Sequence, residues 1–104
     1  MTERRRLPNR RASETLDIDV GGRKYRCSFS RYPDGRLAEI FISNNRVNSD
    51  SDTAARDSAV VCSIALQYGV PVETIRRALM RDSAGRPSGP LGVALDLLCS
   101  KESA

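Results

Sequence analysis

The 104-residue sequence has no histidine and no tryptophan, and its three cysteines stand far apart, at positions 27, 62 and 99. Without histidine, the chain lacks the commonest general base and the commonest metal ligand in proteins. An odd number of widely spaced cysteines argues against both a disulfide framework and a zinc knuckle. We therefore expect Cys27, Cys62 and Cys99 to be separate small hydrophobic residues, and we predict no catalytic residue, no metal site and no bound cofactor.

Long apolar runs are also absent, since none approaches the roughly 18 residues that a helix needs to span a bilayer. The N-terminal residues are rich in arginine but lack the apolar stretch of a secretory signal. A chain of 104 residues has room for one domain at most. We expect a cytoplasmic protein with no membrane partner.

Positive charge is concentrated at the N-terminus. Five arginines and one glutamate give the first twelve residues a net charge of +4, which equals the formal net charge of the whole chain. We predict that residues 1–12 form a disordered basic arm. Such an arm can bind an anionic partner such as nucleic acid, and a solvated leader without a ligand is the alternative. The arginines are Arg4, Arg5, Arg6, Arg10 and Arg11.

Three segments alternate between apolar and polar residues, as half-buried strands do. They are residues 13–20, 23–32 and 37–43. The dipeptide Gly21-Gly22 between the first two is a strong hairpin signal. Pro33-Asp34-Gly35 is typical of a turn between the second and third. We predict an antiparallel meander in which acidic residues of the first strand face basic residues of the second.

The stretch from Asp50 to Met80 predicts two helices joined at Gly69, with Pro71 opening the second. Ser51 or Asp52 suits the N-cap of the first helix. Two neighbouring apolar stripes on this helix predict a wide buried face. The first stripe is Ala55, Ala59, Cys62 and Leu66, and the second is Ala54, Val61, Ala65 and Tyr68. Small residues in its first half would let another backbone come close.

The overall prediction is an α+β fold in which a three-stranded antiparallel meander packs on this helical hairpin. A short third helix, with Leu91, Leu95 and Leu98 on one side, completes the fold. We place a single domain at residues 13–99 and a frayed tail at residues 100–104.

The order of these segments resembles the TSCPD domain. That domain occurs near the C-terminus of adenosylcobalamin-dependent ribonucleotide reductases and as short free-standing bacterial proteins. The resemblance runs from Leu7 to Leu98 and includes YPDGRLAEIFI, SDSDTAARDSAVVCSIALQYGVPVETIRRAL and GPLGVALDLL. Its most specific parts are Asp34-Gly35-Arg36 ahead of Glu39-Ile40-Phe41, and residues 65–79.

One departure from the family limits what the resemblance implies. The Thr-Ser-Cys-Pro-Asp signature is absent, because Cys99 is followed by Ser100 and Lys101. In such reductases the radical cysteine, its reducing cysteine pair and the cobalamin site belong to a large barrel domain that this chain lacks. The resemblance thus implies a non-catalytic accessory module that contacts a protein partner, such as a reductase subunit. A homo-oligomer is the alternative.

Two clusters are candidate contact sites. Asp34, Gly35, Arg36 and Glu39 lie together in sequence near one turn and could contact a protein or a nucleotide, although a plain turn also explains them. On the second helix a basic patch would serve the alternative function, nucleic-acid binding together with the arginine arm. The patch consists of Arg76, Arg77 and Arg81. Thr74 is its only neighbour suited to reading base edges, which disfavours sequence-specific DNA binding.

Overall fold

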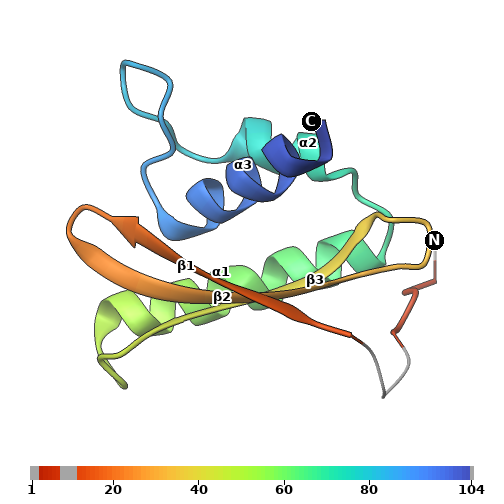
Figure 1. The fold of residues 1–104 in the computed structure, drawn as a ribbon, viewed down its shortest axis with the longest axis horizontal. Coiled ribbons are helices and arrows are strands. Elements are labelled where there is room, and N and C mark those ends of the chain that lie inside the picture. The colour runs from red at the N-terminus through yellow and green to blue at the C-terminus, as the bar shows by residue number, and fades with distance from the viewer. Residues whose placement is uncertain (1–2, 8–11, 104) are drawn as a thin grey trace.

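The computed structural model describes residues 3–7 and 12–103 and confirms the α+β class (Figure 1). Its three strands form one antiparallel sheet in the order β1-β2-β3, so the predicted meander is confirmed. Three helices follow. The elements are β1 (Glu14–Val20), β2 (Arg23–Arg31), β3 (Leu37–Asn44), α1 (Asp50–Gln67), α2 (Val72–Ala78) and α3 (Pro90–Ser103).

The β1–β2 hairpin turns at Gly21 and Gly22, whose φ angles of 60° and 82° lie in the left-handed region. Two consecutive left-handed residues match the twist of the flanking strands, and glycine adopts this conformation without steric cost. The register places Asp17 opposite Arg26, and their side chains form an ion pair with an N–O distance of 3.2 Å. The predicted charge pairing across the first two strands is therefore confirmed.

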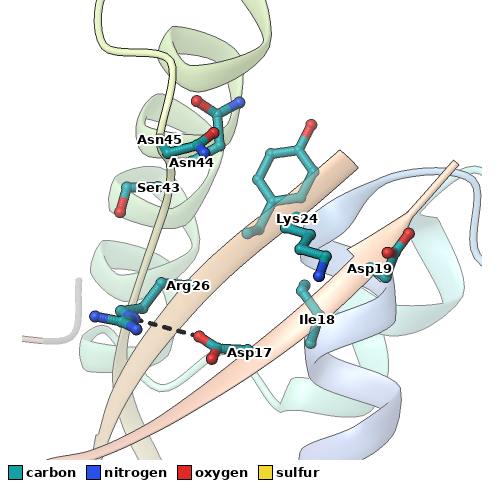
Figure 2. Close-up of a pocket in the computed structure, with 9 residues that line it drawn as sticks. Asp17, Ile18, Asp19, Lys24, Arg26, Ser43, Asn44 and Asn45 are labelled. Atoms are coloured by element: carbon teal, nitrogen blue, oxygen red, sulfur yellow. Dashed lines mark hydrogen bonds and ion pairs between the residues drawn. The ribbon is translucent and has the colours of Figure 1, made fainter. Parts of the chain in front are cut away.

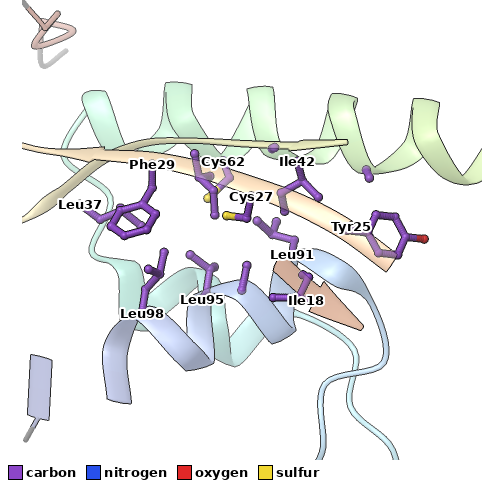
Figure 3. Close-up of a cluster of buried hydrophobic side chains, with 14 of the residues drawn as sticks. Ile18, Tyr25, Cys27, Phe29, Leu37, Ile42, Cys62, Leu91, Leu95 and Leu98 are labelled. Carbon is purple, nitrogen blue, oxygen red and sulfur yellow. The ribbon is translucent and has the colours of Figure 1, made fainter. Parts of the chain in front are cut away.

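One face of the sheet carries the core. Alternate residues of the three strands point to this face, and they meet apolar side chains from α1 and α3 (Figure 3). The buried strand residues are Ile18, Tyr25, Cys27, Phe29, Leu37, Ile40 and Ile42. Leu95 and Leu98 of α3 are almost fully buried, and each such side chain contributes roughly 1.5–3 kcal/mol of transfer free energy.

The three helices occupy different positions relative to the sheet. α1 runs along β3, whereas α3 covers the core face (Figure 1). α2 contacts α3, and its residues Val72 and Ile75 are partly buried against the core. The predicted α1–α2 hairpin therefore does not form the helical layer by itself. The reason is that α2 has only seven residues and none of them is buried, while α3 supplies the buried residues Leu91, Ala94, Leu95 and Leu98.

All three cysteines are buried, as expected of small hydrophobic residues. Burial raises the pKa of the Cys27 thiol to about 12 and that of the Cys62 thiol to about 11. Both thiols are therefore protonated at neutral pH, and a protonated thiol is neither a good nucleophile nor a metal ligand. Within the described residues, no group of three histidine, cysteine or acidic side chains could hold a metal ion. No helix in this part of the chain is long and apolar enough to cross a membrane.

Candidate protein-docking surface

α1 lies close against the free edge of β3 because the residues between them are small. Ala55 and Ala59 are one helical turn apart and are 1% and 0% exposed. A methyl side chain at these positions allows the helix backbone to approach the strand, which a larger residue would prevent. The expectation from the alanine-rich first half of this helix is confirmed, and the backbone that comes close is that of β3.

Three polar side chains of α1 satisfy backbone groups along the edge of β3. Asp52 accepts a hydrogen bond from the Asn44 N–H at 2.8 Å, and Gln67 donates one to the Ala38 carbonyl at 3.2 Å. Between them, the Ser63 hydroxyl accepts from the Ile40 N–H at 2.9 Å and lies 2.8 Å from the Ile40 carbonyl. An edge strand exposes unpaired backbone groups, so these contacts close the edge and hold α1 in register.

Asp52 also contributes a charge to this contact. Its side chain is buried, and its second carboxylate oxygen accepts a hydrogen bond from Arg56 Nε at 2.8 Å. The Asn44 N–H, and to a smaller extent the Arg56 guanidinium, hold the pKa of the Asp52 carboxyl below its ordinary value. The N-cap of α1 is Ser49, which accepts from the Asp52 N–H. The prediction of Ser51 or Asp52 as the cap was wrong because Asp52 is needed at the strand edge.

The opposite side of α1 is apolar and exposed. Val61 is 67% exposed, Val60 and Tyr68 are 44% and 43% exposed, and Ile64 is 37% exposed. Phe41, on the outer face of β3, is 47% exposed and lines a shallow groove together with Val60. We call these five residues the α1 outer face.

The α1 outer face corrects one prediction from the sequence. The second apolar stripe of this helix was expected to be buried, but Ala54, Val61 and Tyr68 are exposed and Ala65 is half-buried. A helix beside the edge of a three-stranded sheet has a neighbour on one side only, so one stripe stays in contact with solvent. Clustered exposed apolar side chains on a small domain are typical of an interaction site.

Arg4 and Arg5 of the N-terminal segment contact the C-terminal end of α1. The Arg5 N–H donates to the Gln67 carbonyl at 2.7 Å, and Arg4 Nε donates to Gln67 Oε1 at 2.6 Å. The Arg5 guanidinium lies 4.1 Å from the centre of the Tyr32 ring and 3.8 Å from an oxygen of Asp34. Arg6 is exposed. Arg10 and Arg11 lie outside the described residues, so the predicted anionic-partner arm stays a prediction.

The predicted contact cluster at the β2–β3 turn is divided in the structure. Asp34 and Arg36 bond to each other, with Arg36 Nε donating to Asp34 Oδ2 at 2.9 Å. The Arg36 N–H and guanidinium hold the pKa of Asp34 below its usual value. Gly35 has a φ of 92°, as the turn requires. Glu39 is buried within β3, whereas the side chains of Asp34 and Arg36 at the turn are exposed. The contact role of these four residues stays a prediction.

The basic patch predicted near α2 is mostly paired within the molecule. Arg76 Nε lies 3.0 Å from Asp96 of α3, and Arg81 bonds to both oxygens of the same carboxylate. Arg76 also pairs with Glu73 at 2.6 Å. Arg77 is exposed, with no partner among the described residues. Two of the three arginines thus fasten α2 and the following segment to α3.

Three comparisons relate the sequence to known proteins. The chain is 39% identical over 71 residues to the vitamin B12-dependent ribonucleotide reductase of Agrobacterium fabrum, which covers 68% of this chain and 6% of the reductase. It is 38% identical over 73 residues to that of Bradyrhizobium diazoefficiens, covering 70% of this chain and 6% of the reductase. It is also 38% identical over 72 residues to the vitamin B12-dependent ribonucleotide reductase of Rhodopirellula baltica, covering 69% of this chain and 7% of the reductase.

The chain therefore spans a small part of the length of the curated relatives that it matches. No family model matches the sequence, and no solved structure matches it significantly. Over about 70% of its length, the chain is homologous to a segment of vitamin B12-dependent ribonucleotide reductases.

Proposed function

We propose that this chain is a non-catalytic accessory domain that acts by binding a vitamin B12-dependent ribonucleotide reductase polypeptide. The reductase polypeptide lies either in the same chain or in a separate one. The homology supports this choice of partner, since the related segment belongs to a reductase many times its length. In the relatives, most of the polypeptide lies outside the segment and is therefore available to contact it.

The α1 outer face is the observation that carries the proposal. Its apolar residues are exposed while the other side of the helix is fixed to β3 by Asp52, Ser63 and Gln67. A rigid helix loses little conformational entropy on binding, which favours its use as a docking element. An apolar groove on the reductase would accept residues spaced three and four apart, as Val60, Val61, Ile64 and Tyr68 are.

The cysteines support a non-catalytic role. Ribonucleotide reduction of the type that the TSCPD resemblance implies uses a radical thiol and a reducing pair of thiols. Cys27 and Cys62 are buried in the core, and their raised pKa values keep them protonated. A turnover assay of the purified chain with cobalamin, a reductant and a ribonucleoside diphosphate is expected to give no deoxyribonucleotide.

A pair of valine substitutions tests the docking surface. Val61 and Val47 are 67% and 70% exposed, but Val47 lies in the loop before α1 and outside the α1 outer face. We expect Val61→Glu to weaken binding to a B12-dependent reductase lacking the homologous segment by at least about tenfold, because a charge would be buried in an apolar contact. Val47→Glu should bind like wild type. Isothermal titration calorimetry gives both affinities.

Three results would overturn the proposal. The first is equal binding by Val61→Glu and wild type, which would remove the α1 outer face as the contact. The second is a stable homodimer that Val61→Glu dissociates, which would identify a second copy of the chain as the occupant. The third is reductase activity of the chain alone.

A further inference from the structure

The end of the β1–β2 hairpin overhangs the sheet. Pairing between β2 and β3 begins at Tyr25 opposite Asn44, so Arg23 and Lys24 extend past the last residue of β3. A polar cleft of about 500 Å³ lies between this overhang and the loop that leads to α1. Its lining residues are Gly21, Gly22, Arg23, Lys24, Asn44, Asn45 and Arg46. We call it the hairpin cleft.

The walls of the hairpin cleft are held by hydrogen bonds. Ser51 at the start of α1 accepts from Arg23 at 3.2 Å and from the Asn44 side-chain amide at 3.0 Å. The backbone of Arg46 is fixed on both sides. Its N–H donates to Asn44 Oδ1 at 2.9 Å, and its carbonyl accepts from the Ser49 hydroxyl at 2.6 Å. The cleft is thus pre-formed.

Several donors in the hairpin cleft have no partner. Within the described part of the chain, the side chains of Lys24, Asn45 and Arg46 make no hydrogen bond or ion pair. Elsewhere in this part, arginines such as Arg26 and Arg56 are paired with carboxylates. Figure 2 shows Lys24, Asn44 and Asn45 lining the adjoining cleft, together with the Arg26–Asp17 ion pair.

Among the described residues, no carboxylate on the strands forms an ion pair with Lys24. Asp19 is the cross-strand neighbour of Lys24, but no ion pair within 4.0 Å joins them. Asp19 Oδ1 instead accepts a hydrogen bond from the Gly22 N–H at 3.1 Å, which stabilises the turn. Three cations, Arg23, Lys24 and Arg46, therefore surround one pre-formed cleft.

We propose that the hairpin cleft binds a polyphosphate anion, either free or as part of a nucleotide. Guanidinium and ammonium groups form strong charge-assisted hydrogen bonds with phosphate oxygens, and an arginine can bind two of them at once. The cleft volume lies within the usual range for small ligands. The inference does not depend on the proposed docking function, because the cleft lies before the start of α1 and contains no residue of its outer face.

Titrations followed by NMR test this assignment. Adding ATP or inorganic tripolyphosphate at low salt should shift the amide signals of residues 21–24 and 44–46, whereas adenosine should shift none of them. We expect the double variant Lys24→Gln, Arg46→Gln to bind ATP at least about tenfold more weakly, since two charge-assisted contacts are lost. Arg77→Gln is the matched control, because it removes an exposed and unpartnered cation outside the cleft. Its affinity should stay within about twofold of wild type.

Three outcomes would overturn the proposal. One is the absence of shifts at millimolar ATP and tripolyphosphate. Another is an equal loss of affinity in the double variant and in Arg77→Gln, which would indicate diffuse charge attraction and no defined site. The third is binding of a deoxythymidine oligomer through the same residues more than about tenfold more tightly than ATP, which would make a polynucleotide the source of the phosphates.

Discussion

The two sides of α1 differ from those of an ordinary surface helix, because polar residues are buried beside its apolar stripe on one side and apolar residues are exposed on the other. The side toward β3 buries the polar residues Asp52, Ser63 and Gln67. The side away from the sheet exposes Val60, Val61, Ile64 and Tyr68. An amphipathic helix that packs on the face of a sheet buries its apolar stripe. α1 buries such a stripe, which includes Ala59 and Leu66, but it also packs on an edge, where unpaired backbone groups require polar partners.

This difference separates the stabilising role of α1 from its proposed binding role. Substitutions on the inner side should change the free energy of unfolding, because they affect close packing and buried hydrogen bonds. Substitutions on the outer side should change the affinity for a partner and leave stability nearly unchanged.

The largest effect is expected from a bulky residue on the side of α1 that packs against β3. Ala59 is fully buried there, and Ala59→Leu should lower the free energy of unfolding by about 3 kcal/mol because it forces the helix away from the strand. Val61→Leu adds one methylene group on the exposed side and should change it by less than about 0.5 kcal/mol. Urea denaturation of both variants measures the difference. Equal effects would contradict the assignment of the two sides.

A smaller loss is expected when the central edge contact is removed. Ser63→Ala leaves the Ile40 N–H without its partner, which should cost about 2 kcal/mol. The control is Ser58→Ala, because the Ser58 hydroxyl bonds only to the Ala55 carbonyl of the same helix. Its cost should stay below about 0.5 kcal/mol. Hydrogen exchange should also show faster exchange of the Ile40 amide in Ser63→Ala only, and unchanged protection would argue against the edge contact.

The charge of Asp52 should make the stabilising effect of the inner side of α1 depend on pH. The pKa of Asp52 is lowered in the folded state, so its contribution to stability is complete above its unfolded pKa and is lost as the pH falls through the folded value. The free energy of unfolding of wild type should therefore exceed that of Asp52→Asn most at neutral pH. The difference should narrow as the pH falls below 3.8, the ordinary pKa of an aspartate carboxyl. A constant difference in urea titrations from pH 7 to pH 2 would contradict the lowered pKa of Asp52 in the folded state.

The smallest effect on stability is expected at the centre of the α1 outer face. Ile64→Lys replaces a partly exposed side chain with one whose long stem still covers the same surface. We expect the midpoint of thermal unfolding to shift by only a few degrees. A large drop in the midpoint would mean that Ile64 belongs to the core of the isolated chain and is not available to contact a partner.

Much of the fold could be predicted from local sequence patterns. The alternation of Leu16, Ile18 and Val20 and the Gly21-Gly22 turn determine β1 and its hairpin without knowledge of distant contacts. Such patterns do not specify which helix packs on the sheet. The competition between α2 and α3 depends on how many large apolar side chains each presents to the sheet.

The docking surface could be predicted only in part. The width of the apolar region on α1 predicted that both stripes are buried, but only one of them is. Asp52, Ser63 and Gln67 carried a signal, since they interrupt a stripe of small residues at helical spacing. Their role depends on the register between α1 and β3, which brings Asn44, Ile40 and Ala38 opposite them in turn. No single segment of the sequence contains that information.

The central claim is that the exposed side of α1 binds a B12-dependent reductase while its other side holds the fold. Methyl cross-saturation NMR of the labelled chain with unlabelled reductase tests it directly. The account predicts strong attenuation at Val60, Val61 and Ile64 and none at Val47. Attenuation at Val47 with unaffected signals at Val61 and Ile64 would contradict it.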